Sequence, residues 1–120
     1  MGKIGARVPA RDQTVVMTDR TNLEAGDGHQ FTAHVARPTG TAKGALVVIQ
    51  EIFGVNAHIQ SVCDRFAADG WIAVAPALFD RAERGVELTY TMENGAHGKS
   101  LREQASRARR RAASLASTAR

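Results

Sequence analysis

The sequence contains a single cysteine, Cys63, and few aromatic residues: one Trp, one Tyr and four Phe among 120 residues. One cysteine excludes an internal disulfide and a cysteine-based zinc site, and it fits a reducing compartment. There is no run of about 18 apolar residues, and residues 1–7 lack the apolar stretch of a secretion signal. We therefore expect one small cytoplasmic domain that holds no metal or cofactor and does not cross a membrane.

The basic excess is confined to the last third of the chain. Residues 1–80 contain seven Lys or Arg and eight Asp or Glu, whereas residues 81–120 contain nine and four. The net charge of +4 therefore comes from the C-terminal segment alone. A basic field spread over the whole fold would indicate an anionic partner, but a local basic segment needs its own explanation.

An antiparallel pair of strands is predicted to open the fold. Residues 14–19 form a short strand-like run, and residues 29–36 alternate polar side chains with Phe31, Ala33 and Val35. Alternation of this kind is the period of a strand that is buried on one face.

A βαβ unit is the firmest structural prediction. Residues 45–49 form a continuous apolar run, which is typical of a central parallel strand covered on both faces. Asn56 can cap a helix, and Gly70 stands where a helix C-terminal glycine belongs. A second apolar strand covers residues 71–75 and is stopped by Pro76. The helix between them has one apolar stripe, which consists of Ile59, Val62, Cys63, Phe66 and Ala67.

The pattern weakens after Arg81. Residues 83–98 combine polar residues and glycines, while residues 99–120 have good helix propensity but only Leu101 and Leu115 as large apolar side chains. Such a helix has almost no stripe to bury, so we expect a helical or disordered basic tail. The predicted division is a domain over residues 1–105 and a tail over residues 106–120.

Glu51 is the sharpest candidate for chemistry. In open α/β sheets, ligands bind beyond the carboxyl ends of the parallel strands, and Glu51 directly follows the first apolar strand. A carboxylate there can act on a neighbouring nucleophile, although a strand-end acid that simply meets water is the more common case. The segment after the second strand, residues 76–81, should lie beside it.

The wider motif carries a family resemblance. Residues 50–59 (Gln-Glu-Ile-Phe-Gly-Val-Asn-Ala-His-Ile), together with residues 63–71 and 76–81, strongly resemble the dienelactone hydrolase family. The match covers roughly residues 10 to 105. It implies an α/β-hydrolase fold, present here only in its N-terminal part, whose members open the lactone ring of dienelactones formed in catechol degradation with a Cys-His-Asp triad.

The resemblance also implies roles for individual residues. The glutamate that matches Glu51 helps the resting thiol become a thiolate, and the backbone N–H that matches Ile52 helps form the oxyanion hole. Arg102 resembles the arginine that binds the substrate carboxylate, and Phe53 is expected to contact substrate. This chain has Ser106 where an aromatic residue is expected near that arginine.

The nucleophile elbow Gly-x-[Ser/Cys]-x-Gly is absent from these 120 residues. Cys63 cannot replace it, because it belongs to the apolar stripe of a helix and a buried structural role is expected there. The triad Asp and His would follow the elbow in the chain, and the four histidines show no metal-ligand spacing. We therefore predict that this chain alone is inactive. The resemblance to a hydrolase family leaves open whether it is an enzyme.

The Arg-rich residues 107–111 have three interpretations. A chain that is truncated or frameshifted after about residue 105 ranks first, a solvated or disordered end second, and weak nucleic-acid binding a distant third.

Two functions remain. The chain is a hydrolase by descent, acting on a small lactone or ester if it is completed. Alternatively, it is a non-catalytic partial α/β domain that binds a partner, or itself, through an exposed sheet edge or the basic tail.

Overall fold

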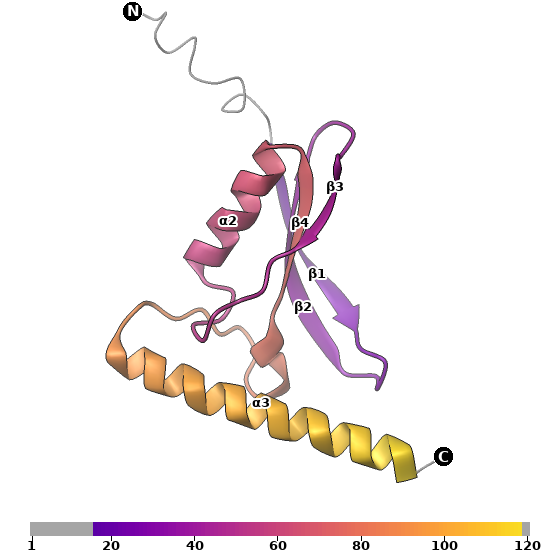
Figure 1. Cartoon of the computed structure of the whole chain (residues 1–120), viewed down its shortest axis with the longest axis vertical. Coiled ribbons are helices and arrows are strands. Elements are labelled where there is room, and N and C mark those ends of the chain that lie inside the picture. Colours follow the sequence, from indigo (N-terminus) through magenta and orange to yellow (C-terminus); the bar gives the residue numbers. More distant parts are fainter. Residues whose placement is uncertain (1–15, 119–120) are drawn as a thin grey trace, which may run out of the picture.

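The computed structural model describes residues 16–118. One four-stranded mixed sheet has the strand order β1-β2-β4-β3, and a long helix lies across its lower end (Figure 1). The elements in chain order are β1 (Val16–Glu24), β2 (Gln30–Pro38), β3 (Gly44–Val47), α2 (Ala57–Ala68), β4 (Trp71–Pro76), the 3-10 helix η2 (Leu78–Arg81) and α3 (Met92–Thr118).

The predicted antiparallel opening is confirmed. β1 pairs with β2 along its whole length, from Val16 opposite Pro38 to Glu24 opposite Gln30. Both strands extend farther towards their C-terminal ends than the sequence indicated, and residues 14 and 15 of the first predicted strand lie outside the described residues. β2 then pairs antiparallel with β4, which joins this hairpin to the rest of the sheet.

The βαβ unit is also confirmed. β3 runs parallel to β4, and α2 covers one face of the sheet (Figure 1). The Asn56 side chain accepts a hydrogen bond of 3.2 Å from the Ile59 N–H, which is the expected N-cap. Ile59, Cys63 and Ala67 are buried against β2 and β4, whereas Phe66 is 39% exposed and therefore lies at the margin of the predicted stripe.

The expectation that residues 45–49 are covered on both faces is wrong. β3 is the edge of the sheet and ends at Val47, and the side chains of Val47 and Ile49 are 65% and 60% exposed. The physical reason is that α2 covers one face only, and within residues 16–118 no strand pairs with the outer side of β3. An apolar strand edge is thus open.

The last helix begins seven residues before the predicted helical segment. α3 starts at Met92, where the Thr91 hydroxyl oxygen accepts a 3.0 Å hydrogen bond from the Asn94 N–H, and it continues without interruption past residue 105. Its first half is held by Leu101, which packs in a second cluster with Phe79 and Val86. Its second half runs beneath the lower end of the sheet, and its last turns project past the β1–β2 hairpin (Figure 1).

Two further findings concern the described residues as a whole. No helix within residues 16–118 is long and apolar enough to cross a membrane. In the same residues, no three His, Cys, Asp or Glu side chains gather in a group that could hold a metal ion.

Candidate functional site

The two strand ends that the sequence singled out lie side by side. The Gln50 side chain joins them, because its Oε1 atom accepts a 2.9 Å hydrogen bond from the Leu78 N–H at the start of η2. Its Nε2 atom donates a 3.1 Å hydrogen bond to the Glu51 carbonyl oxygen. One amide therefore fixes the loop after β3 against the segment after β4.

A glycine shapes the turn that follows. Gly54 has φ +80°, and a Cβ atom there would lie 2.1 Å from the Val86 carbonyl oxygen. Only glycine combines this backbone conformation with such a close approach. The Leu88 N–H donates a 2.8 Å hydrogen bond to the Phe53 carbonyl oxygen, so residues 86–88 support this turn from outside.

Helix α3 approaches the same loop through a second glycine. A Cβ atom on Gly98 would lie 1.8 Å from the Ile52 carbonyl oxygen, so this turn of α3 touches the loop backbone directly. Leu101, 1% exposed, packs on Phe79 one turn later and anchors the helix below η2. The loop after β3, η2 and α3 thereby form three walls around one space.

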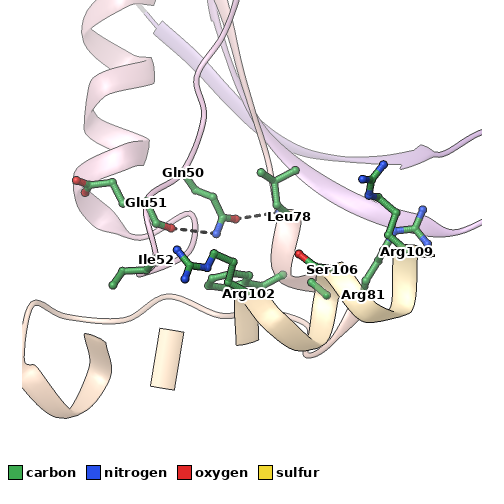
Figure 2. Close-up of a pocket in the computed structure, with 10 residues that line it drawn as sticks. Gln50, Glu51, Ile52, Leu78, Arg81, Arg102, Ser106 and Arg109 are labelled. Atoms are coloured by element: carbon green, nitrogen blue, oxygen red, sulfur yellow. Dashed lines mark hydrogen bonds between the residues drawn. The ribbon is translucent and has the colours of Figure 1, made fainter. Parts of the chain in front are cut away.

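That space is a cleft of about 490 Å³, open to solvent (Figure 2). Its lining is Gln50, Glu51, Ile52, Leu78, Phe79, Arg81, Arg102, Ala105, Ser106 and Arg109. Leu78, Phe79 and Ala105 are among its apolar residues, and three of its six polar side chains are arginines. The cleft lies at the carboxyl ends of β3 and β4, where α/β sheets bind their ligands.

Glu51 lines the cleft, but its carboxylate turns away from Arg102 (Figure 2). The Tyr90 hydroxyl donates a 3.0 Å hydrogen bond to Glu51 Oε1 on the outer side of the loop. The Tyr90 ring in turn packs edge-on against Phe53, with 4.5 Å between the ring centroids. The carboxylate is therefore exposed and held by one hydroxyl group.

The other predicted site residues separate into two groups. Ile52 and Arg102 both line the cleft, from the loop and from α3 respectively. The Ile52 N–H donates no hydrogen bond within residues 16–118. Phe53 is not part of the cleft lining, and its ring lies against Tyr90 instead.

The three arginines of the cleft differ in their partners. Arg81 pairs with Asp27 at 2.8 Å, and both side chains are largely covered. The His29 N–H donates to the Asp27 carboxylate and is the main cause that lowers the pKa of Asp27, with Arg81 adding to the effect. Arg102 and Arg109 make no ion pair within the described part of the chain, so their charges face the cleft uncompensated.

Cys63 is far from nucleophilic. The side chain is fully buried in the α2 stripe, and burial, assisted by the neighbouring Asp64, raises the pKa of the Cys63 thiol to about 11. Very little thiolate exists at neutral pH in such an environment. None of the histidines lines the cleft, and His34 and His97 instead face Asp64 and Glu83.

Arg81, Arg109, Gln50 and Tyr90 belong to the site and were not among the predicted site residues. Arg81 and Gln50 lie inside the recognised motif, so the motif itself could have pointed to them. Arg109 follows Arg102 by seven residues, a spacing that places both on one helix face, but that signal exists only once the segment is known to be helical. No sequence signal pairs Tyr90 with Glu51.

Comparisons with known proteins identify the family of this chain. Residues 31–119 match the family model described as the dienelactone hydrolase family. This chain belongs to the dienelactone hydrolase family. A provisionally named carboxymethylenebutenolidase of Azospirillum brasilense is 54% identical over 74 residues, which are 61% of this chain and 32% of that protein. The carboxymethylenebutenolidase of Pseudomonas putida is 34% identical over 73 residues, covering 61% and 31% respectively.

A solved structure gives the same assignment for the fold. A provisionally named dienelactone hydrolase of Klebsiella pneumoniae superposes with a TM-score of 0.55 at 31% identity, over 67% of this chain and 34% of that one. The predicted α/β-hydrolase architecture, present in part, is thereby confirmed. The chain spans about a third of the length of the relatives it matches.

Proposed function

We propose that this chain supplies one half of a dienelactone-hydrolase site, and that it acts on a small lactone or ester when the rest of the family fold provides the nucleophile. The observation that carries the proposal is the loop of residues 50–54, which brings Glu51 and Ile52 to the rim of a cleft faced by Arg102. Each of these residues has a separate task in the chemistry.

Ile52 contributes to the oxyanion hole in this proposal. Attack on a lactone carbonyl creates a negatively charged oxygen, which a preorganised backbone N–H stabilises. The Ile52 N–H is free for this purpose, because it donates no hydrogen bond within residues 16–118. The Ile52 carbonyl oxygen, on the following peptide unit, lies close against Gly98, so α3 contacts the loop next to this N–H.

Glu51 acts on the thiol. A cysteine thiol near its ordinary pKa is mostly protonated at neutral pH, so a carboxylate beside it raises the reactive thiolate fraction. Within residues 16–118, Tyr90 is the one hydrogen-bond partner that holds the Glu51 carboxylate on the outer side of the loop. Giving up one exposed hydrogen bond costs about 1 kcal/mol, so the side chain can turn towards a thiol at the cleft.

Arg102 binds the carboxylate of the substrate. It approaches the cleft from α3, opposite the loop that carries Ile52, and it has no ion-pair partner in the described residues (Figure 2). A guanidinium group in this position can hold a carboxylate by two parallel hydrogen bonds and so orient the carbonyl towards the oxyanion donor.

Residues 1–120 are inactive on their own in this proposal. They contain no Gly-x-[Ser/Cys]-x-Gly, and their only thiol is buried in α2. The nucleophile, its histidine and its aspartate must therefore come from the remaining part of the family fold, whichever chain carries that part.

A chimera tests this proposal. The 74-residue part of this chain that matches the Azospirillum brasilense relative replaces its counterpart there, which restores a full-length family member. We expect this chimera to hydrolyse a dienelactone, and Glu51→Gln to lower kcat by about 100-fold because a positioned acid–base group is lost. Glu103→Gln is the matched control, since Glu103 lies outside the cleft lining and pairs with Arg107. A folded chimera without activity, or equal losses in both variants, would contradict the proposal.

A second candidate function rests on the open edge of β3. The unpaired backbone groups of an edge strand pair readily with another chain, and the exposed side chains of Val47 and Ile49 add apolar surface there. We propose that the chain associates with itself through this edge.

Sedimentation over a range of protein concentrations tests this second candidate. We expect concentration-dependent dimers that Val47→Lys converts to monomers, because a lysine on an edge strand opposes pairing. Leu115→Lys, at a similarly exposed position on α3, should leave the dimer intact. A monomer at every concentration would exclude association through this edge.

A further inference from the structure

The cleft has a positive charge at each end. Arg102 lies at the end near Gln50 and Ile52, whereas Arg109 lies at the opposite end beside Arg81 (Figure 2). Both arginines belong to α3 and are seven residues apart, so their Cα atoms are separated by about 10 Å along one helix face. Ser106 lies between them and also lines the cleft.

The two end charges are available to a ligand. Asp27 already neutralises Arg81 at 2.8 Å, so Arg81 does not bring a free charge to its end of the cleft. Arg102 and Arg109 have no ion-pair partner in the described residues, in contrast to Arg107, which faces Glu103 from the same helix. Glu51 is the acidic residue of the lining, and its carboxylate turns outward to Tyr90.

The middle of the cleft has a different character. Leu78 and Ser106 lie between the two arginines in Figure 2, and Phe79 and Ala105 are further apolar residues of the lining. Apolar side chains favour a hydrocarbon segment over a third charged group, because burial of an unpaired charge is costly. The lining therefore fits an elongated molecule with an apolar body.

We propose that the cleft takes a dianionic substrate, an elongated molecule with one carboxylate at Arg102 and a second carboxylate at Arg109. This inference rests on the proposed function, since it specifies the substrate class of the same cleft. The carboxylate at Arg102 positions the reacting carbonyl, and the carboxylate at Arg109 selects substrates with a remote second acid group. A substrate with a single carboxylate uses only the first of these contacts.

Calorimetric titration of the full chain at low ionic strength tests this assignment with two probes. Suberate carries a carboxylate at each end, and octanoate has the same number of carbons but only one carboxylate. We expect suberate to bind about tenfold more tightly than octanoate, because a charge-assisted hydrogen bond to an uncompensated arginine has roughly that effect.

Three variants locate the second carboxylate. Arg109→Gln should lower the affinity for suberate by about tenfold and leave the affinity for octanoate unchanged. Arg102→Gln should lower the affinity for both probes. Arg110→Gln removes the same charge from the neighbouring position of α3, which is not part of the cleft lining, and should behave as the parent chain. Circular dichroism confirms that each variant keeps its helix.

Three outcomes would overturn the assignment: equal affinity for the two probes, no binding of suberate, or equal effects of Arg109→Gln and Arg110→Gln. The titration does not depend on hydrolysis. Failure of the chimera to turn over would therefore refute the proposed function without altering the binding result. Loss of suberate preference would refute the dianionic substrate while hydrolysis by the chimera remained intact.

Discussion

The βαβ unit and helix α3 are held in the fold in opposite ways. In the βαβ unit, side chains fill the space between helix and sheet: Ile59, Cys63 and Ala67 of α2 are buried against the alanines of β4. In α3, close contact with the loop is possible because a glycine has no side chain. Gly98 lets the helix backbone reach the Ile52 carbonyl oxygen, and within residues 92–118 Leu101 is the one large side chain of α3 that is buried.

This difference explains why one wall of the cleft is rigid and the other is attached at few points. The loop after β3 is fixed by Gln50, by Gly54 and by the pairing of β3 with β4. Helix α3 is fixed mainly at its Gly98–Leu101 turn, and Leu115 near its end is 69% exposed. Both free arginines of the cleft therefore depend on a single helical turn for their position.

Substitution of Gly98 should have the largest effect. A Cβ atom 1.8 Å from the Ile52 carbonyl oxygen cannot be accommodated, so Gly98→Ala must lift α3 and expose Leu101. We expect the free energy of unfolding, measured in urea, to fall by about 3 kcal/mol or more. Gly95→Ala is the matched control in the same helix: its Cβ would meet only Ile52 Cδ1 at 4.0 Å. Gly95→Ala should raise the free energy of unfolding by about 0.5–1 kcal/mol, because alanine has a higher helix propensity than glycine. Equal effects at both glycines would remove the contrast between the two regions.

Truncation of Leu101 should have the next largest effect. Leu101→Ala empties a fully buried position between Phe79 and Val86, and large-to-small changes of this kind cost about 2–5 kcal/mol. The low end of that range applies here, because the cluster is small and lies close to solvent. Leu115→Ala, on the exposed part of the same helix, should change the free energy of unfolding by less than about 0.5 kcal/mol. A cost at Leu115 similar to that at Leu101 would mean that the second half of α3 is also packed.

The smallest expected effect is the change in stability with pH that is caused by Cys63, and it tests the packing of the βαβ unit. Burial raises the pKa of Cys63 to about 11, so the folded state holds the thiol proton more tightly than the unfolded state does. This contribution to stability is complete below the ordinary thiol pKa and is lost as the pH rises from about 9 towards 11.

Alkylation with iodoacetamide at pH 8 should therefore be negligible in the native chain and complete in urea. Across pH 9 to 11, Cys63→Ala should show a shallower loss of stability than the parent chain, measured in parallel urea titrations. Rapid labelling of the folded chain would show that α2 does not protect the thiol.

The sequence was informative where local pattern and packing agree. The Asn56 cap, the helix stripe and Gly70 identified α2, and the motif of residues 50–54 located the loop that lines the cleft. It predicted good helix propensity from residue 99 but missed the start of α3, because Gly95 and Gly98 weaken the helix pattern in the turns that approach Ile52. It also could not show that β3 is an edge strand, since an apolar run has the same composition at an edge and in the middle of a sheet.

The Gly98 contact has a practical consequence for protein engineering. Helix propensity alone would recommend replacing both glycines of α3 with alanine, and the two substitutions look equivalent by that criterion. One of them would remove an entropic weakness, whereas the other would drive the helix away from the loop and widen the cleft. A stabilising redesign of this chain must therefore keep Gly98, because the Ile52 carbonyl oxygen lies only 1.8 Å from the position that a Cβ atom would take.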